Sequence, residues 1–359
     1  LRRSLIAEGS IFQSTSDSEA VVQLVARSRQ KHLVDRFIDA IKALEGAYSL
    51  VCLSSKKMIG ARDPLGIRPL VLGELNGAYI LSSETCALDI IGAKFIREIE
   101  NGEVVVITPE GIQSIKPFTP QKARPCIFEY IYFSRPDSIV GGRSVYQVRK
   151  QMGRQLAAEA NADVDVVIPV PDSGVPAALG FAEAAHVPFE LGIIRNHYVG
   201  RTFIEPTQHI RALGVKLKHN ANRAVVEGKR IMLVDDSIVR GTTSVKIVQM
   251  MYEAGAREVH MAIASPPIMH PDFYGIDTPE RKALLAATHT VEEMCKFIGV
   301  NSLTFLSVDG IYKAAGFDKR DDTQPQFTDH CFTGDYPTAL TDYDEGVNPH
   351  QLSLLAEAG

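Results

Sequence analysis

The sequence contains no tryptophan, and aromatic residues make up only 7% of its 359 residues. No apolar run approaches the roughly 20 residues that a membrane-spanning helix needs, and no signal peptide is visible, so we expect no membrane role. A surplus of basic residues is also missing: the formal net charge is −5. That charge argues against a general binder of nucleic acids or anionic membranes.

Cysteine is sparse, scattered and odd in number, at Cys52, Cys86, Cys126, Cys295 and Cys331. This distribution is typical of free thiols in a reducing compartment rather than of a disulfide framework, so we expect a cytoplasmic protein. Methionine is absent from the first position, and the opening letters LRRSLIAEGS are typical of the middle of a helix. We therefore expect that the natural beginning of the protein lies upstream of Leu1.

The length predicts two domains, and the patterning changes along the chain. Residues 1–45 repeat apolar positions at helical spacing, and from about residue 47 to 110 short β-rich runs alternate with turn signals, which indicates a meander or sandwich. A connector around KPFTPQKARP precedes an alternation of all-apolar runs and amphipathic helices. Such runs are typical of a parallel sheet covered on both faces. The predicted fold class is α+β followed by α/β, with the apolar strands at 164–170, 189–194, 230–234 and 259–265.

The end of the third apolar run holds the most informative stretch, in which Asp235 and Asp236 follow RIMLV. Ligands of parallel sheets bind beyond the carboxyl ends of the strands. Two adjacent carboxylates need hydroxyl donors or a cation, which suits a Mg²⁺-bound sugar diol. The next helix opens with Gly241, Thr242, Thr243 and Ser244, whose amides and hydroxyls suit a phosphate. A solvated loop with an ordinary helix cap is the alternative.

The whole string from Val234 to Ser244, VDDSIVRGTTS, resembles the phosphoribosyl-pyrophosphate signature of type I phosphoribosyltransferases. In that family the two acids hold the ribose hydroxyls and the Thr/Ser loop holds the 5′-phosphate. The segments FEYIYFSRPDS, VIPVPDSG, RNHYVGRTFIEPTQ and HNANRAVVEGKR narrow the resemblance to the glutamine phosphoribosylpyrophosphate amidotransferases. It extends from Leu1 to about Tyr336 and implies a glutaminase part at residues 1–120, a transferase domain at 121–335 and a tail at 336–359.

The resemblance implies roles for further residues. Ser173, in the PDSG loop, would help to place Mg²⁺ with Asp235 and Asp236, although such a loop can also be a simple turn. The basic segment 195–220 would be a flap that closes over the substrate, or else a solvated surface loop. The expected substrate-binding residues beyond the acid pair and the 241–244 loop are Tyr198, Arg201, Lys218 and Arg240, with Lys218 contacting pyrophosphate and Tyr198 relaying closure to the glutaminase site.

The first part of the chain resembles the later portion of an N-terminal-nucleophile glutaminase. Asp17 matches the acid that binds the α-amino group of glutamine, although by position it is also a helix N-cap. The family's nucleophile is a cysteine at the mature amino terminus, and that residue is not in this chain. Cys52 and Cys86 do not match it and are interpreted as buried thiols.

Some members of the family hold a [4Fe–4S] cluster on four cysteines. The corresponding positions here are Cys126, Asp272, Pro325 and Thr328. One thiol cannot hold a cluster that needs four, so we predict the cluster-free form with Mg²⁺ as the cofactor. The resemblance also implies phosphoribosyl pyrophosphate and glutamine as substrates, purine nucleotides as feedback inhibitors, and a homotetramer.

Two other functions remain open at this point. A nucleobase or orotate phosphoribosyltransferase would share the 234–244 motif, although the attached meander argues against it. A regulator that binds phosphoribosyl pyrophosphate without turnover is of a different class, and such proteins usually carry a DNA-binding segment with a basic face. The amidotransferase interpretation implies formation of 5-phosphoribosylamine, the first committed step of purine synthesis.

Overall fold

A computed structural model describes residues 1–196, 219–276, 278 and 280–340. The described residues divide into two compact units, one made of residues 1–46 and 336–340, the other of residues between Ala47 and Asp335. The first unit is helical, as predicted, with α1 at Arg2–Ala7, α2 at Ser18–Arg27 and α3 at Leu33–Lys42. Helices α2 and α3 pack against each other, and α3 buries Phe37, Ala40 and Ile41, which share one helical face.

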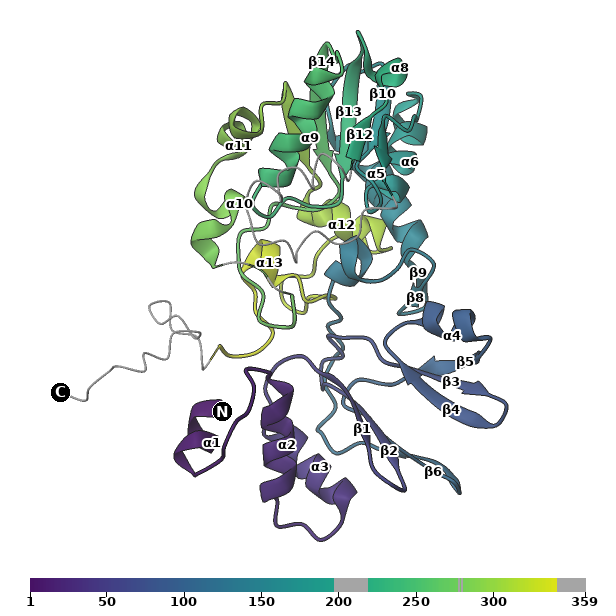
Figure 1. The fold of residues 1–359 in the computed structure, drawn as a ribbon, viewed down its shortest axis with the longest axis vertical. Helices are drawn as coiled ribbons and strands as arrows, with labels where there is room; N and C mark the ends of the chain where they lie inside the picture. Colours follow the sequence, from purple (N-terminus) through teal and green to yellow (C-terminus); the bar gives the residue numbers. More distant parts are fainter. Residues whose placement is uncertain (197–218, 277, 279, 341–359) are drawn as a thin grey trace, which may run out of the picture. The chain divides into compact units, whose positions relative to one another are not determined.

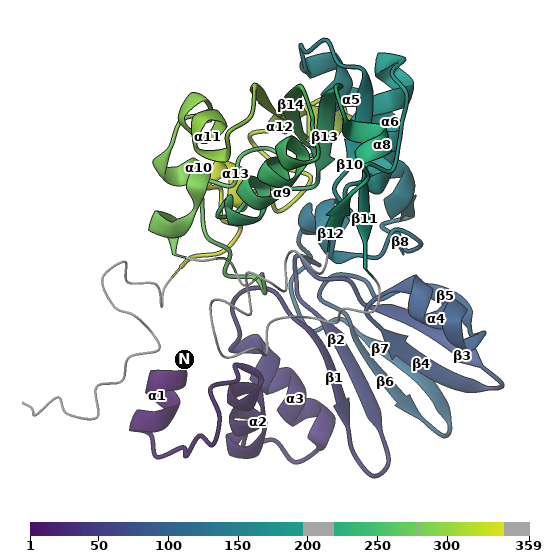
Figure 2. The same ribbon diagram turned by 45° about the horizontal axis from the view of Figure 1, so that its top comes forward.

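The meander predicted after residue 47 forms two antiparallel sheets within the second unit (Figure 2). One sheet has the order β1-β2-β6-β7, with β1 at Ser49–Leu53, β2 at Met58–Arg62, β6 at Val104–Thr108 and β7 at Gly111–Ile115. The other has the order β4-β3-β5, with β3 at Val71–Leu75, β4 at Ala78–Ser82 and β5 at Lys94–Glu98. Helix α4 (Thr85–Ile91) follows β4. Leu70, Leu72, Ile99 and Val105 form a buried cluster between strands of both sheets.

A four-stranded parallel sheet with the order β10-β13-β14-β15 organises the rest of this unit. Its strands are β10 at Val166–Pro169, β13 at Arg230–Asp235, β14 at Glu258–Ile263 and β15 at Ser302–Phe305. Helices cover both faces, with α6 and α9 on opposite sides in Figure 1. The main helices are α5 at Val145–Glu159, α6 at Val175–Ala185, α9 at Thr242–Glu253, α11 at Val291–Ile298 and α12 at Val308–Ala314. The predicted parallel α/β architecture is confirmed.

The prediction of a strand of the parallel sheet at 189–194 holds only in part. Only β11 (Ile193–Arg195) is a strand there, and it pairs antiparallel with β12 (His219–Ala221) in a separate two-stranded sheet. Phe189 makes an isolated parallel bridge with Val167, so the chain touches the edge of the main sheet and then leaves it. The fourth strand of the sheet is β15, whose short run SLTF gives a weak sequence signal.

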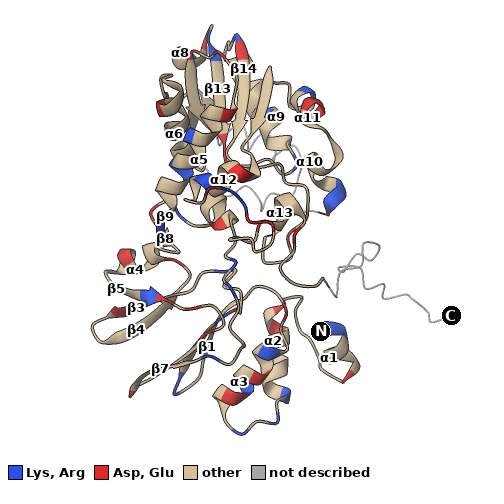
Figure 3. Ribbon diagram, turned by 180° about the vertical axis from the view of Figure 1, so that it is seen from behind, with Lys and Arg blue, Asp and Glu red and all other residues tan. Residues whose placement is uncertain are grey.

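Shorter elements connect these parts, namely a π-helix at Glu129–Phe133, β8 at Ile139–Val140, β9 at Arg143–Ser144, α8 at Arg223–Val226, a 3-10 turn at Arg281–Ala283, α10 at Leu285–Thr288 and α13 at His330–Thr333. In the part of the chain that the structure describes, no helix has the length and apolar character needed to cross a membrane. Lys and Arg are interspersed with Asp and Glu along these elements in Figure 3.

Candidate active site

The aspartate pair lies where β13 ends. Asp235 is the last residue of the strand, and both aspartates are 8% exposed. The Asp236 backbone N–H donates to Asp235 Oδ1 at 2.9 Å, which fixes the orientation of the Asp235 carboxylate. Burial, followed by the neighbouring charge of Asp236, raises the pKa of Asp235 well above its ordinary value. The pair is therefore a site that a cation or hydroxyl donors would stabilise.

Asp236 already receives two hydroxyl donors. Ser173 Oγ donates to Oδ1 at 2.8 Å and Ser237 Oγ donates to Oδ2 at 3.0 Å. Ser173 reaches Asp236 because β10 and β13 are parallel neighbours, so the loops that follow them leave the sheet at the same edge. The next residue, Gly174, makes this approach possible, since a Cβ there would lie 2.4 Å from the Val234 carbonyl oxygen. The structure thus brings Ser173 and the acid pair together.

The predicted phosphate loop is the N-terminus of α9, a helix of twelve residues. Gly241 is the N-cap and adopts a left-handed conformation with φ of 74°. Thr242 and Thr243 are exposed and Ser244 is buried. Because α9 begins a short loop after β13 ends at Asp235, its first amides lie at the same edge of the sheet as the acid pair. Arg240 precedes the loop and is exposed.

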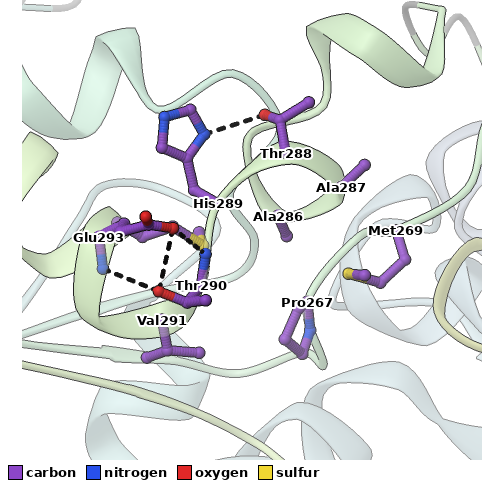
Figure 4. Close-up of a pocket in the computed structure, with 10 residues that line it drawn as sticks. Pro267, Met269, Ala286, Ala287, Thr288, His289, Thr290, Val291 and Glu293 are labelled. Carbon is purple, nitrogen blue, oxygen red and sulfur yellow. Dashed lines mark hydrogen bonds between the residues drawn. The ribbon is translucent and has the colours of Figure 1, made fainter.

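Helix α10 supports this loop from behind. Leu285 N–H donates to the Val239 carbonyl at 2.9 Å, and a Cβ on Gly241 would lie 2.6 Å from Leu285 Cδ2. A hollow of about 430 Å³ lies beyond α10 and is shown in Figure 4, where Thr290 and Glu293 cap α11. None of the predicted site residues lines it. The polar groups at the strand ends, rather than this hollow, mark the candidate active site.

Of two arginines near these loops, Arg149 was not identified from the sequence pattern as part of the site, whereas Arg195 is the first residue of the basic segment 195–220 that was predicted to be a flap. Arg195 on β11 forms an ion pair with Asp172 of the PDSG loop. Arg149 on α5 is 4% exposed and donates to the carbonyls of Tyr130 and Ser134 at 2.6 and 2.7 Å. Burial lowers the pKa of Arg149, and the negative charge of Asp236 opposes that shift. Arg149 therefore fixes the FEYIYFSRPDS segment to α5 at a place where the charge of Asp236 is felt.

Tyr198, Arg201 and Lys218 lie outside the described residues. Asp17 occupies the predicted N-cap position of α2, but its side chain makes no capping hydrogen bond. Glu19 instead accepts hydrogen bonds from the backbone N–H groups of Gln13 and Ser14 at 2.7 and 2.9 Å. The role of Asp17 in binding glutamine stays a prediction.

The positions that correspond to cluster ligands are buried. Cys126 makes an isolated bridge with Thr328, and Pro325 is also buried. Burial raises the pKa of the Cys126 thiol to about 12, although the charge of Arg68 opposes the shift. The carboxylate of Asp272 is held by backbone N–H groups of its own loop.

Comparison with known proteins decides the family. Residues 1–89 match the model of a glutamine amidotransferase domain, and residues 143–265 match the model of a phosphoribosyl transferase domain. An amidophosphoribosyltransferase of Rhizobium etli is 63% identical over 365 aligned positions, which cover 100% of this chain and 74% of that protein. The chain belongs to the amidophosphoribosyltransferase family.

Further members of the amidophosphoribosyltransferase family are similar to this chain over nearly its whole length. The Bacillus subtilis enzyme is 49% identical over 98% of this chain and 73% of its own length. A solved structure of glutamine phosphoribosylpyrophosphate amidotransferase from B. subtilis, complexed with ADP and GMP, superposes with a TM-score of 0.89 at 49% identity, covering 97% of this chain and 76% of that one. The predicted family and its combination of a glutaminase part with a type I transferase fold are confirmed.

Proposed function

We propose that the edge formed by the acid pair, Ser173 and the start of α9 binds phosphoribosyl pyrophosphate and transfers its phosphoribosyl group to ammonia. The products are 5-phosphoribosylamine and pyrophosphate, with glutamine as the source of ammonia. The observation that supports this site best is the hydrogen bond from Ser173 to Asp236, because it joins the expected pyrophosphate loop to the expected ribose site. Membership in the amidophosphoribosyltransferase family supports the reaction.

The donor set of this edge suits Mg²⁺. Two adjacent carboxylates and a serine hydroxyl are hard oxygen donors, the ligands that Mg²⁺ prefers. Burial and the neighbouring charge of Asp236 raise the pKa of Asp235. Two buried like charges are stable together only when a cation or a proton compensates them. Ser173, Asp235 and Asp236 would hold the ion directly or through its waters. When bound, it would supply positive charge to the departing pyrophosphate.

The residues around the substrate have separate tasks. Asp235 and Asp236 would accept hydrogen bonds from the ribose hydroxyls, which fixes the sugar ring. The N–H groups and hydroxyls of Thr242, Thr243 and Ser244 would bind the 5′-phosphate at the positive end of the helix. The bond from ribose C1 to the pyrophosphate oxygen breaks, the bond from C1 to nitrogen forms, and the ammonium product loses a proton to solvent. Positioning and charge stabilisation would therefore supply most of the rate acceleration.

The remaining assignments follow from the family. Residues 1–120 would form part of the glutaminase domain, with Asp17 binding the α-amino group of glutamine, and residues 121–335 would form the transferase domain. Lys218, Arg201, Tyr198 and Arg240 would complete the substrate site. One relative is named as complexed with ADP and GMP, and we propose purine nucleotides as feedback inhibitors of this protein as well. We also propose a cytoplasmic homotetramer in the cluster-free form.

Pyrophosphate release from phosphoribosyl pyrophosphate, measured with ammonia, with adenine and with no acceptor, tests the proposal. Release that depends on ammonia is the expected result. Release that depends on adenine would instead identify a nucleobase transferase. Tight binding of phosphoribosyl pyrophosphate without release under any condition would identify a regulator.

A further inference from the structure

Three buried side chains of different chemistry lie close together, and none of them belongs to the acid-pair site. They are Asp272, on the loop after β14, and His330 and Cys331, the first two residues of α13. Their exposures are 7%, 1% and 1%, and one potential ligand atom from each lies within 4.8 Å of the others. A carboxylate, an imidazole and a thiol in one buried cluster form a recurrent set of metal ligands.

The separations of the three atoms are within about 0.5 Å of those around a tetrahedral zinc ion. His330 Nε2 lies 2.8 Å from Asp272 Oδ2 and 3.4 Å from Cys331 Sγ, and the Sγ to Oδ2 separation is 4.0 Å. Around a tetrahedral zinc ion, with bonds of about 2.0 Å to N and O and about 2.3 Å to S, such atoms lie about 3.3–3.6 Å apart. No separation needs to change by more than about 0.5 Å to accept the ion.

The surroundings orient the carboxylate toward this point. Asp272 Oδ1 accepts hydrogen bonds from the backbone N–H groups of Tyr274 at 2.8 Å and Ile276 at 2.7 Å. Its other oxygen, Oδ2, is the one near His330 and Cys331. Outer hydrogen bonds of this kind fix the orientation of ligating carboxylates in metal sites. The backbone also joins the two segments, because Met269 and His270 donate to the Cys331 carbonyl at 2.8 and 3.1 Å.

We propose that Asp272, His330 and Cys331 bind one Zn²⁺ ion that cross-links the loop after β14 to α13. The mixed N, O and S donor set suits zinc, whereas Mg²⁺ requires oxygen ligands. Binding converts the Cys331 thiol to a thiolate and releases its proton to solvent. The two negative charges of Asp272 and the thiolate then balance the charge of the ion in a buried place.

The competing arrangement has no metal. In it His330 pairs with Asp272, and Cys331 stays a neutral thiol, which fits with burial raising the pKa of that thiol. The two arrangements differ in metal content and in the spectrum of a bound cobalt ion. They do not differ in the acid-pair chemistry, because the cluster contains none of the residues assigned to that site.

Zinc content, measured by mass spectrometry on the purified protein after equilibration with equimolar Zn²⁺ and removal of free ion, tests the proposal. One tightly held zinc per chain is expected, as is a thiolate-to-cobalt charge-transfer band when Co²⁺ replaces Zn²⁺ in the unmodified protein. His330→Gln and Cys331→Ser should each lose the zinc, and Cys331→Ser should lose the band. Cys295→Ser, which removes a half-buried thiol on α11, is the matched control and should keep both.

Two results would overturn the proposal. One is unmodified, folded protein that takes up neither zinc nor cobalt, and this measurement decides the matter even if the variants do not fold. The other is a Cys331→Ser variant that binds zinc and shows the cobalt band as the unmodified protein does.

Discussion

Ser173 donates a 2.8 Å hydrogen bond to Asp236 across 63 residues of sequence. The bond spans two loops that follow neighbouring parallel strands, so it fixes the PDSG loop relative to the acid pair. Because Asp236 is buried, removing the donor leaves its carboxylate less well satisfied and the loop less well placed.

The Ser173→Ala variant should lower ammonia-dependent turnover by about ten- to a hundredfold, since a small misplacement of positioning groups has effects of this size. Ser237→Ala is the control, because it removes a hydrogen bond to the same carboxylate without separating two loops. Initial rates of pyrophosphate release at saturating Mg²⁺ provide the comparison. Equal losses in the two variants would contradict a special role for the link between loops.

The raised pKa of Asp235 gives a pH dependence of stability with a definite sign. A carboxyl whose pKa is raised by folding adds stability that is fully present below its ordinary pKa and is lost as the pH rises through the raised value. In the protein without Mg²⁺, the burial of Asp235 beside Asp236 therefore lowers the free energy of unfolding at neutral pH relative to acidic pH. Asp235→Asn should raise the free energy of unfolding there by about 1–3 kcal/mol, and the gain should shrink as the pH falls.

Asp165 provides a control, because its pKa is shifted in the opposite direction to that of Asp235. Hydrogen bonds from Arg230 hold its pKa at about 2, so its stabilising contribution is present above the ordinary carboxyl pKa and is lost as the pH falls through about 2. Asp165→Asn should destabilise the protein at neutral pH. Thermal unfolding between pH 4 and 8 in the absence of divalent ions checks both variants. A loss of stability in Asp235→Asn at neutral pH would contradict the account of the acid pair.

Gly241 combines a left-handed backbone with close packing. Gly241→Ala places a methyl group against Leu285, so the variant should lose about 2–4 kcal/mol of stability and most of its activity as the phosphate loop shifts. Gly228→Ala is matched, since Gly228 has φ of 72° and open space around its Cβ position. That control should lose only about 1–2 kcal/mol and keep its activity. Unfolding curves and ammonia-dependent rates of both variants distinguish the effect of the close contact with Leu285 from the effect of backbone strain alone.

Iron should be absent from the protein. Of the four positions that correspond to cluster ligands, only Cys126 offers a thiol, and a [4Fe–4S] cluster requires four ligands. Iron and acid-labile sulfide assays on anaerobically purified protein should find neither at stoichiometric levels. A brown protein with both elements would show that the ligand positions are misassigned.

The sequence predicted the parallel sheet because β10, β13 and β14 are built on apolar runs whose residues are almost all buried, which is the pattern of strands covered on both faces. It did not identify β15, which is only four residues long. It also assigned the run around β11 to the parallel sheet, because a short apolar run does not show which strand it pairs with. The acid pair and the helix start were identified because the residues are contiguous. Arg149 and the cluster of Asp272, His330 and Cys331 were not, because tertiary packing alone brings such scattered residues to one place.

The most direct test of the proposed site is the initial rate of pyrophosphate release with ammonia and Mg²⁺ for the unmodified protein and for an Asp235→Asn/Asp236→Asn double variant. The substitutions keep the shape of both side chains and remove both charges, so circular dichroism should show the same fold. The proposed roles of the pair in holding the ribose hydroxyls and the ion predict that the rate falls by orders of magnitude. A near-normal rate in the double variant would contradict the assignment.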